Sequence, residues 1–303
     1  MPTGLITKAL SGFYYVLPDE GGTGPIQCRA RGIFKKRGLT PLVGDRVIYS
    51  MTDGGEGTVD ELLPRTTELI RPPVANVDTA LLVFAVSEPE ISLTLLDKFL
   101  VHTEKAGLQT IICLTKSDLL DDGSDTDSDA AIRIAQIQKI YGDMGYSVLL
   151  CSAKGGVGTE EVLRALEGKV TVFSGQSGVG KSSLLNRLIP GLQQETGEIS
   201  NRLGRGKHTT RHVEFIRHPM GGYVADTPGF SQLDFEGIEA EQLSRYFADM
   251  SPLMDQCKFR GCLHRGEPDC AVLQAVNGGQ IEQSRYDNYL QFVEEIRERK
   301  RRY

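Results

Sequence analysis

A glycine-rich segment in the middle of the chain has the residue types and spacing that bind a nucleotide phosphate. It follows an apolar run at residues 170–173 and precedes a helix predicted over residues 182–188. In such a loop, backbone N–H groups surround the β-phosphate, a lysine reaches the β and γ oxygens, and the following hydroxyl binds Mg²⁺. We therefore predict a nucleoside triphosphate site formed by Gly175, Gln176, Ser177, Gly178, Val179, Gly180, Lys181, Ser182 and Ser183.

Two further motifs indicate which base this site accepts. The segment Thr115-Lys116-Ser117-Asp118 directly follows a predicted buried strand, and Ser152-Ala153-Lys154 follows the next one. An aspartate in this place can accept hydrogen bonds from the N1–H and the exocyclic amine of guanine, a pair that adenine does not offer. The Lys116 stem can pack along the base, and the amides of the second motif can meet the guanine O6. The sequence thus predicts GTP, read by Thr115, Lys116, Asp118, Ser152, Ala153 and Lys154.

A third motif at the end of a predicted strand, Asp226-Thr227-Pro228-Gly229, is suited to the γ-phosphate and its metal ion. Asp226 can hold Mg²⁺ through water, and the amide of Gly229 can meet the γ-phosphate. A pair of threonines in the preceding glycine-rich loop can reach the same metal and phosphate. The predicted magnesium ligands are therefore Ser182, Thr209, Thr210 and Asp226.

The residue that would orient the attacking water is absent from its usual place. Many GTPases carry a glutamine just after the third motif, whereas this chain has Phe230 after Gly229. His208 is the catalytic candidate, because a neutral imidazole can accept a hydrogen bond from water and hold it in line. His212 is the nearest competitor. Since a loop must be ordered before His208 can act, we expect low activity in the isolated protein.

Three of the six cysteines cluster with a histidine near the C-terminus. Three thiolates and one imidazole make a complete tetrahedral set for Zn²⁺ and leave no position open for water, so the expected role is structural. The alternative, a group of buried or reactive free cysteines, is disfavoured by the clustering. The predicted metal ligands are Cys257, Cys262, His264 and Cys270.

The elements that must position these residues change character along the chain. Residues 1–68 alternate short strand patterns with glycine-rich breaks, which predicts a small β-barrel, an OB-fold first and an SH3-like barrel as the alternative. The predicted strands are residues 11–16, 26–29, 45–49 and 58–62. Residues 69–235 alternate apolar strand runs with amphipathic helices, the pattern of a doubly wound parallel sheet with an α/β fold. The predicted elements include strands at residues 79–86 and 147–150 and a helix at residues 93–105. Residues 236–303 are predicted to be helical around the metal cluster. The 71–73 stretch, with two consecutive prolines, is expected to be a linker.

Charge and hydropathy limit the setting of the protein. The net charge is −6, and the six aspartates between residues 118 and 129 account for it. The remaining chain has basic patches at residues 29–37, 202–211 and 297–302, which suit either an anionic partner or a solvated surface. No run of 18 apolar residues and no basic start before an apolar segment occurs, so we expect no membrane span, a cytoplasmic location and a monomer.

The order of the motifs indicates a circular permutation, because both base-reading motifs precede the phosphate loop. The sheet edge that assembles the site is preserved when old ends are joined and new ones opened. In this order, and in residues 204–211 and the metal cluster, the chain resembles the RsgA family of bacterial GTPases. Thr115 departs from the asparagine usual in other GTPases, although relatives in this family look similar.

The resemblance implies an N-terminal OB-fold, a permuted GTPase domain and a zinc-bearing helical domain. It also implies a role in late maturation of the 30S ribosomal subunit, contact with 16S rRNA, hydrolysis stimulated by that subunit, and release of assembly factors. An alternative is a nucleotide-gated rRNA-binding module in which turnover is incidental. A P-loop kinase of a small metabolite is disfavoured, because the two base-reading motifs would then have no purpose.

Overall fold

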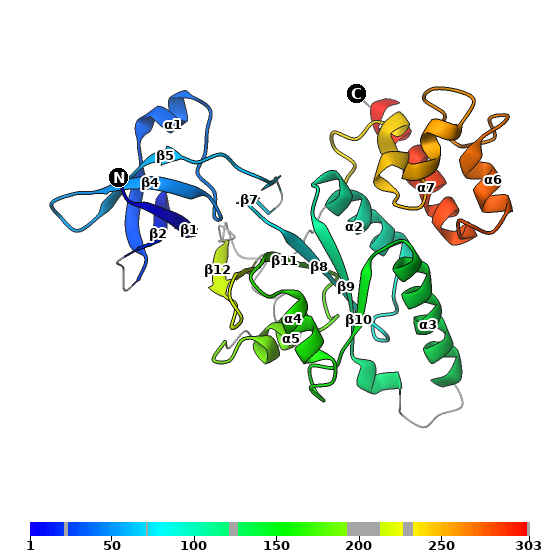
Figure 1. The fold of residues 1–303 in the computed structure, drawn as a ribbon, viewed down its shortest axis with the longest axis horizontal. Helices are drawn as coiled ribbons and strands as arrows, with labels where there is room; N and C mark the ends of the chain where they lie inside the picture. Colours follow the sequence, from blue (N-terminus) through cyan, green and yellow to red (C-terminus); the bar gives the residue numbers. More distant parts are fainter. Residues whose placement is uncertain (21–23, 71, 121–126, 193–212, 227–232, 302–303) are drawn as a thin grey trace.

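The structure is a computed structural model that describes residues 1–20, 24–70, 72–120, 127–192, 213–226 and 233–301. Figure 1 shows three regions: an N-terminal barrel, a central sheet with helices on its faces, and a C-terminal group of helices beside α2. None of the helices in these described ranges combines the length and apolar character needed to cross a membrane.

The N-terminal region is a closed five-stranded barrel. Its strands pair in the order β1-β2-β3-β5-β4, and β4 returns to β1. The β3–β5 pair is parallel and the others are antiparallel, which is the connectivity of an OB-fold and confirms that expectation over the SH3-like alternative. The elements are β1 Thr3–Leu10, β2 Phe13–Pro18, β3 Ile26–Ala30, α1 Gly32–Lys36, β4 Arg46–Met51 and β5 Gly57–Leu62.

Local turn chemistry explains where the barrel departs from the predicted elements. A strand predicted from Ser11 begins instead at Phe13, and β1 was missed altogether. Ser11 and Gly12 both have positive φ, 51° and 83°, as a two-residue type I′ hairpin turn requires.

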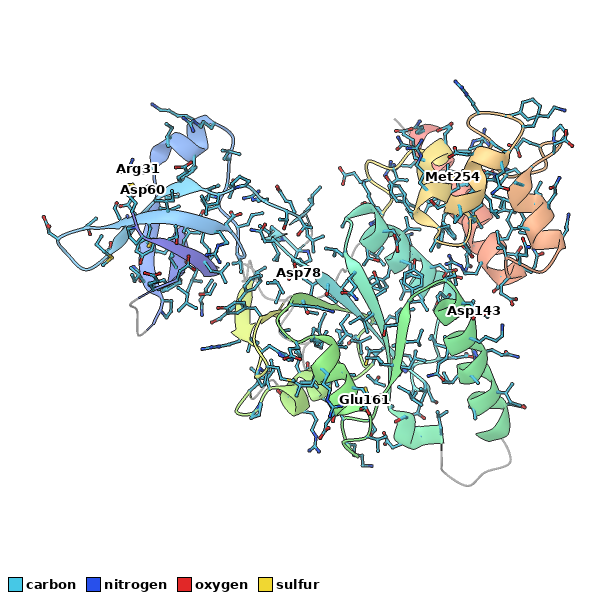
Figure 2. The ribbon with its side chains drawn as sticks, in the orientation of Figure 1. Arg31, Asp60, Asp78, Asp143, Glu161 and Met254 are labelled. Carbon is cyan, nitrogen blue, oxygen red and sulfur yellow. The ribbon has the colours of Figure 1, made fainter. Side chains whose placement is uncertain are left out.

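The barrel also carries an ion pair between Arg31 and the buried side chain of Asp60, which lie side by side in Figure 2.

The stretch between the barrel and the central sheet is not an open linker. The short strands β6 Glu68–Leu69 and β7 Val74–Ala75 pair antiparallel, so Pro72 and Pro73 lie in the turn between them. Consecutive prolines suit a turn because they fix φ and donate no backbone hydrogen bond.

The central sheet has the order β10-β9-β8-β11-β13-β12, parallel except for β12, which runs antiparallel to β13 and also pairs with β1 of the barrel. Strand β8 is buried along its whole length and lies between β9 and β11. The carboxyl ends of β9, β8 and β11 therefore share one edge of the sheet. The elements are β8 Thr79–Ala85, α2 Leu93–Lys105, β9 Gln109–Thr115, α3 Asp127–Asp143, β10 Ser147–Leu150, α4 Thr159–Ala165, β11 Val170–Ser174, α5 Lys181–Leu188, β12 Glu214–Arg217 and β13 Tyr223–Asp226.

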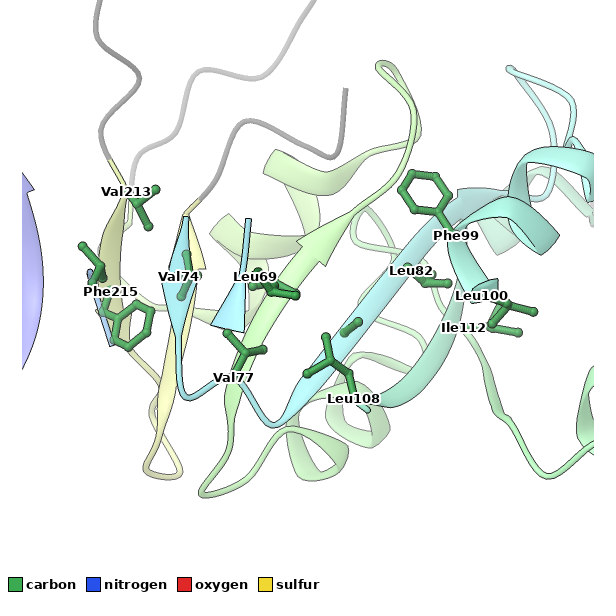
Figure 3. Close-up of a cluster of buried hydrophobic side chains, with 14 of the residues drawn as sticks. Leu69, Val74, Val77, Leu82, Phe99, Leu100, Leu108, Ile112, Val213 and Phe215 are labelled. Atoms are coloured by element: carbon green, nitrogen blue, oxygen red, sulfur yellow. The ribbon is translucent and has the colours of Figure 1, made fainter. Parts of the chain in front are cut away.

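Alternate residues of β8 supply the cores on the two faces of the sheet. Leu82 and Phe84 belong to the cluster beneath α2 and α3, whereas Leu81 and Val83 belong to the one beneath α4 and α5. The first cluster continues through β7 and Phe215 into the barrel, as Figure 3 shows in part. The barrel and one face of the central sheet thus share a continuous apolar core.

The C-terminal region contains two 3₁₀ segments and two helices around its own core. They are η4 Ala240–Tyr246, η5 Ser251–Gln256, α6 Ala271–Asn277 and α7 Gln283–Arg301. Phe247 packs edge-on against Tyr289, with ring centroids 5.3 Å apart, and tilted against Phe292 at 6.2 Å. Val101 of α2 belongs to this cluster, so the region is packed onto the helix that covers the central sheet.

Candidate functional site

The glycine-rich loop joins the end of β11 to the start of α5 at the carboxyl edge of the sheet. Gly175 has φ 150°, and a β-carbon added there would lie 2.1 Å from the carbonyl oxygen of Val83. The loop therefore crosses β8 so closely that only glycine fits at this position. Gly180, with φ 92°, precedes Lys181, the first residue of α5.

Lys181 lies within the loop rather than out in solvent. Its ammonium donates a hydrogen bond to the carbonyl oxygen of Gly175 at 2.8 Å and another to that of Gln176. Burial lowers the pKa of Lys181 to about 8. The cation of the predicted phosphate loop is thus held over the loop backbone, where a bound polyphosphate would be met by charge and N–H groups together.

Thr115 connects the first base-reading motif to the phosphate loop. Its buried hydroxyl oxygen lies 2.5 Å from the carbonyl oxygen of Val179 and 3.1 Å from that of Phe84. A single side chain at the end of β9 therefore joins β8 and the phosphate loop. Its place in the site is behind the loops, where it holds them together.

The two base-reading motifs are also joined directly. The hydroxyl of Ser152 donates to Oδ1 of Asp118 at 2.5 Å and accepts from the N–H of Gly155 at 3.1 Å. Directly beneath, the buried thiols of Cys113 and Cys151 lie 3.4 Å apart. One carboxylate oxygen of Asp118 is thus held by the second motif, which orients the carboxylate that we assign to guanine.

The segment after β8 is a part of the site that the sequence prediction missed. Lys116 has φ 60° and donates a hydrogen bond to the carbonyl oxygen of Glu88. A β-carbon on Gly178 would lie 3.9 Å from Cδ of Pro89. The order of the strands could have indicated this placement. Because β8 lies between β9 and β11, the loop after β8 must lie between the base-reading motif that follows β9 and the phosphate loop that follows β11.

Part of the predicted site falls outside the described residues. This applies to the catalytic candidate His208, to His212, to Thr209 and Thr210, and to Gly229. Asp226 is the last residue of β13, which pairs in parallel with β11. Ser182 lies in the first turn of α5, next to Lys181. The strands therefore bring the phosphate loop and the Asp226 strand end to neighbouring places on one sheet edge.

The predicted metal ligands come together in the C-terminal region. One ligand atom from each of Cys257, Cys262, His264 and Cys270 lies within 4.8 Å of the others. Ligands of a tetrahedral zinc ion are separated by about 3.8 Å for two sulfurs and about 3.5 Å for a nitrogen and a sulfur. The Cys257 and Cys270 sulfurs are 3.9 Å apart, and His264 Nδ1 lies 3.6 Å from the Cys257 sulfur and 3.2 Å from the Cys270 sulfur. The cluster fits a metal ion bound through Nδ1.

The RsgA GTPase family model matches residues 62–236, and the RsgA N-terminal domain model matches residues 3–59. The small ribosomal subunit biogenesis GTPase RsgA of Bacillus velezensis is 54% identical over 303 residues, covering all of both chains. The protein of the same name from Bacillus subtilis is 53% identical over 304 residues, again covering all of both.

The chain belongs to the RsgA family. It is therefore a GTPase, an enzyme that hydrolyses GTP. Among solved structures, YloQ, described as a circularly permuted GTPase, matches with a TM-score of 0.82 and 46% identity over 99% of this chain and 96% of its own. YjeQ from Thermotoga maritima matches with a TM-score of 0.84 and 38% identity over 97% and 98%. The predicted RsgA resemblance and permuted fold are confirmed.

Proposed function

We propose that this RsgA-family enzyme hydrolyses GTP during late maturation of the small ribosomal subunit and is stimulated by the 30S particle. Full-length relatives carry the name small ribosomal subunit biogenesis GTPase. The observation that carries the proposal is the linkage of the site: Thr115 reaches the phosphate loop at Val179, and Ser152 orients Asp118. A base-reading and a phosphate-binding half joined in this way suit one guanine nucleotide.

Each predicted residue receives a proposed role on this basis. Asp118 accepts from the guanine N1–H and exocyclic amine, Lys116 packs along the base, and the amides from Ser152 to Lys154 face O6. The phosphate loop and Lys181 hold the β- and γ-phosphates, with the Gly229 amide at the γ-phosphate. Mg²⁺ bound by Ser182, Thr209, Thr210 and Asp226 would neutralise charge on the phosphate oxygens.

We assign the positioning of the attacking water to His208. Neutral imidazole accepts a hydrogen bond from the water, whose oxygen attacks the γ-phosphorus as the bond to the GDP oxygen breaks. Docking on the 30S particle places His208 for this step, so turnover is slow without the particle. Hydrolysis then lowers affinity for the particle and accompanies release of assembly factors.

The outer regions provide the proposed ribosome contacts. We place the domain boundaries after residues 68 and 235. Zn²⁺ bound by the Cys257, Cys262, His264 and Cys270 cluster has a structural role, because all four positions are filled by protein. The exposed side chains that could reach 16S rRNA phosphates around this centre are Lys258, Arg260 and Arg265. The enzyme would act as a monomer in the cytoplasm, where the particle is assembled.

The test is GTP hydrolysis by the full chain with and without purified 30S subunits. We expect 30S-stimulated turnover in the wild type and a loss of about 10²–10⁴-fold in His208→Ala, with GTP binding retained. His212→Ala is the matched control and should keep stimulated turnover. Equal turnover with and without 30S would contradict the proposal. Nucleotide-dependent 30S binding with unstimulated turnover would instead support a nucleotide-gated rRNA-binding module.

A further inference from the structure

His264 has a backbone conformation that a side chain disfavours. Its φ is 54°, in the left-handed region where a β-carbon is crowded. The ring is buried, and Nδ1 faces the sulfurs of Cys257 and Cys270. Some other part of the fold must hold this conformation, since a residue without support would leave it.

The backbone on both sides of His264 is held by three side chains. Glu267 accepts hydrogen bonds from the N–H of Leu263 at 2.8 Å, through Oε1, and of Arg265 at 2.6 Å, through Oε2. The Tyr286 hydroxyl donates to the carbonyl oxygen of His264 at 2.7 Å. The hydroxyl of a second α7 tyrosine, Tyr289, donates to the Leu263 carbonyl oxygen at 3.1 Å.

The second ring nitrogen of His264 lacks the usual means of orientation. A metal-binding histidine normally donates its other N–H to a carboxylate, a carbonyl or water. Nε2 of His264 is buried and has no hydrogen-bond partner among the described residues. The ring instead lies against that of Tyr289, with centroids 5.9 Å apart. Its direction therefore depends on the backbone and on this ring contact.

We propose that Glu267, assisted by Tyr286 and Tyr289, positions His264 for metal binding by fixing the backbone around it. Glu267 acts through peptide groups and does not bind the ion. The inference rests on the metal centre proposed above and adds three residues that do not themselves bind the metal. Its specific consequence is that the number of hydrogen bonds accepted by residue 267 sets how firmly the ion is held.

Variants at position 267 separate this role from a general effect of charge. The glutamine side chain has one oxygen that can accept a hydrogen bond, whereas the alanine side chain has none. Asp269→Asn is the matched control: it removes one charge from the same loop, its carboxylate pairs with Lys258 at 2.9 Å, and asparagine tolerates its φ of 57°.

The experiment follows zinc transfer from the full-length protein to a chromophoric chelator, after the zinc content of each protein is measured. We expect release to be about 10–100-fold faster in Glu267→Ala, intermediate in Glu267→Gln, and unchanged in Asp269→Asn. The Co²⁺-substituted protein should show altered d–d absorption in Glu267→Ala, a smaller change in Glu267→Gln and none in Asp269→Asn, a signature of changed ligand geometry that a general loss of stability would not produce.

Should Glu267→Ala fail to fold, Glu267→Gln and Tyr286→Phe, which each remove one hydrogen bond, decide the matter by the same release rates. Zinc release from these variants at the wild-type rate would overturn the positioning role while leaving the metal centre intact. A wild-type protein that binds no zinc would overturn both proposals.

Discussion

The barrel meets the central sheet through a shared apolar core and close backbone contacts, whereas the C-terminal helices meet it through a buried ion-pair network. At the barrel, a β-carbon on Gly44 would lie 1.9 Å from the carbonyl oxygen of Ala75 and 3.1 Å from Cζ of Phe215. The side chain of Asn76 donates to the Gly44 carbonyl at 2.8 Å. Backbone shape therefore sets this junction.

At the other junction, charges buried on different elements meet. Asp97 of α2 accepts from Arg285 at 2.5 Å, from Asn288 at 2.7 Å and from the Tyr141 hydroxyl at 2.7 Å. Arg285 also makes two hydrogen bonds to Asp249, at 3.0 and 2.9 Å. Such a group is satisfied only in one arrangement, and removal of one partner leaves the others buried without compensation.

The two attached regions therefore depend on different kinds of contact with the central region, and different substitutions should detach them. We expect the barrel junction to tolerate changes of surface charge but not an added atom at Gly44. We expect the C-terminal junction to be disrupted by the loss of a single charge. Because Asp97 is on α2, the metal-binding region is also held in a fixed position on the helix that covers the central sheet.

The largest effect is expected from Arg285→Ala. It leaves Asp97 and Asp249 buried without their cation, so the free energy of unfolding of the C-terminal region should fall by about 3–5 kcal/mol. Hydrogen exchange should show lost protection in α7 and retained protection in the barrel. Lys139→Ala, which removes an exposed ion pair within α3, is the control and should cause no measurable change. A similarly small effect of Arg285→Ala would contradict the role given to the network.

A smaller but specific effect is expected from Gly44→Ala. The added β-carbon would meet the Ala75 carbonyl, and φ at this position is 93°, so we expect a loss of about 1–3 kcal/mol or more and a barrel that no longer seats on the sheet. Gly12→Ala is matched in backbone, with φ 83°, but a β-carbon there meets nothing within 4 Å. Equal losses for the two variants in thermal unfolding would show that strain alone, and no junction contact, is responsible.

The smallest effect is expected from Lys8→Ala, which removes the ion pair with Glu214 at the β1–β12 contact. The two side chains are 2.8 Å apart and 32% and 51% exposed. Partly exposed pairs contribute about 0–1 kcal/mol and are screened by salt. Thermal unfolding in low and high salt should therefore differ little from the wild type. A loss of roughly 2 kcal/mol would mean that side-chain charge, rather than backbone shape, attaches the barrel.

The elements that the sequence predicted well are those whose patterns are local. Helix α2 was predicted with its observed bounds, Leu93–Lys105, because a periodic apolar face is visible within the segment itself. Strand β10 was also predicted with its observed bounds, Ser147–Leu150, and the buried strand β8 was predicted one residue too long, as 79–86. The gathering of the three cysteines and His264 could be predicted because residue type and spacing are themselves the signal.

The connections within the nucleotide site and at the C-terminal junction could not be predicted, because they join residues that lie far apart in the chain. The hydroxyl of Thr115 meets a carbonyl 64 positions away, and Asp97 meets Arg285 across 188 positions. Thr115 and Val179 belong to two predicted motifs, but the motif spacing does not show that the two residues touch. Asp97 and Arg285 belong to no motif, and Asp97 lies among apolar residues of a helix. Such pairs become visible only when the sheet order and the helix packing are known.

The pairing of Lys8 with Glu214 also has a consequence for synthesis. These residues are 206 positions apart, whereas every other strand pair of the barrel lies within residues 3–62. As the chain emerges, the barrel can close long before β12 exists, and the missing edge follows roughly 150 residues later, on the order of 10–30 s at ordinary translation rates. The nascent barrel can therefore close before the central sheet exists, and its docking is a late, high-contact-order step.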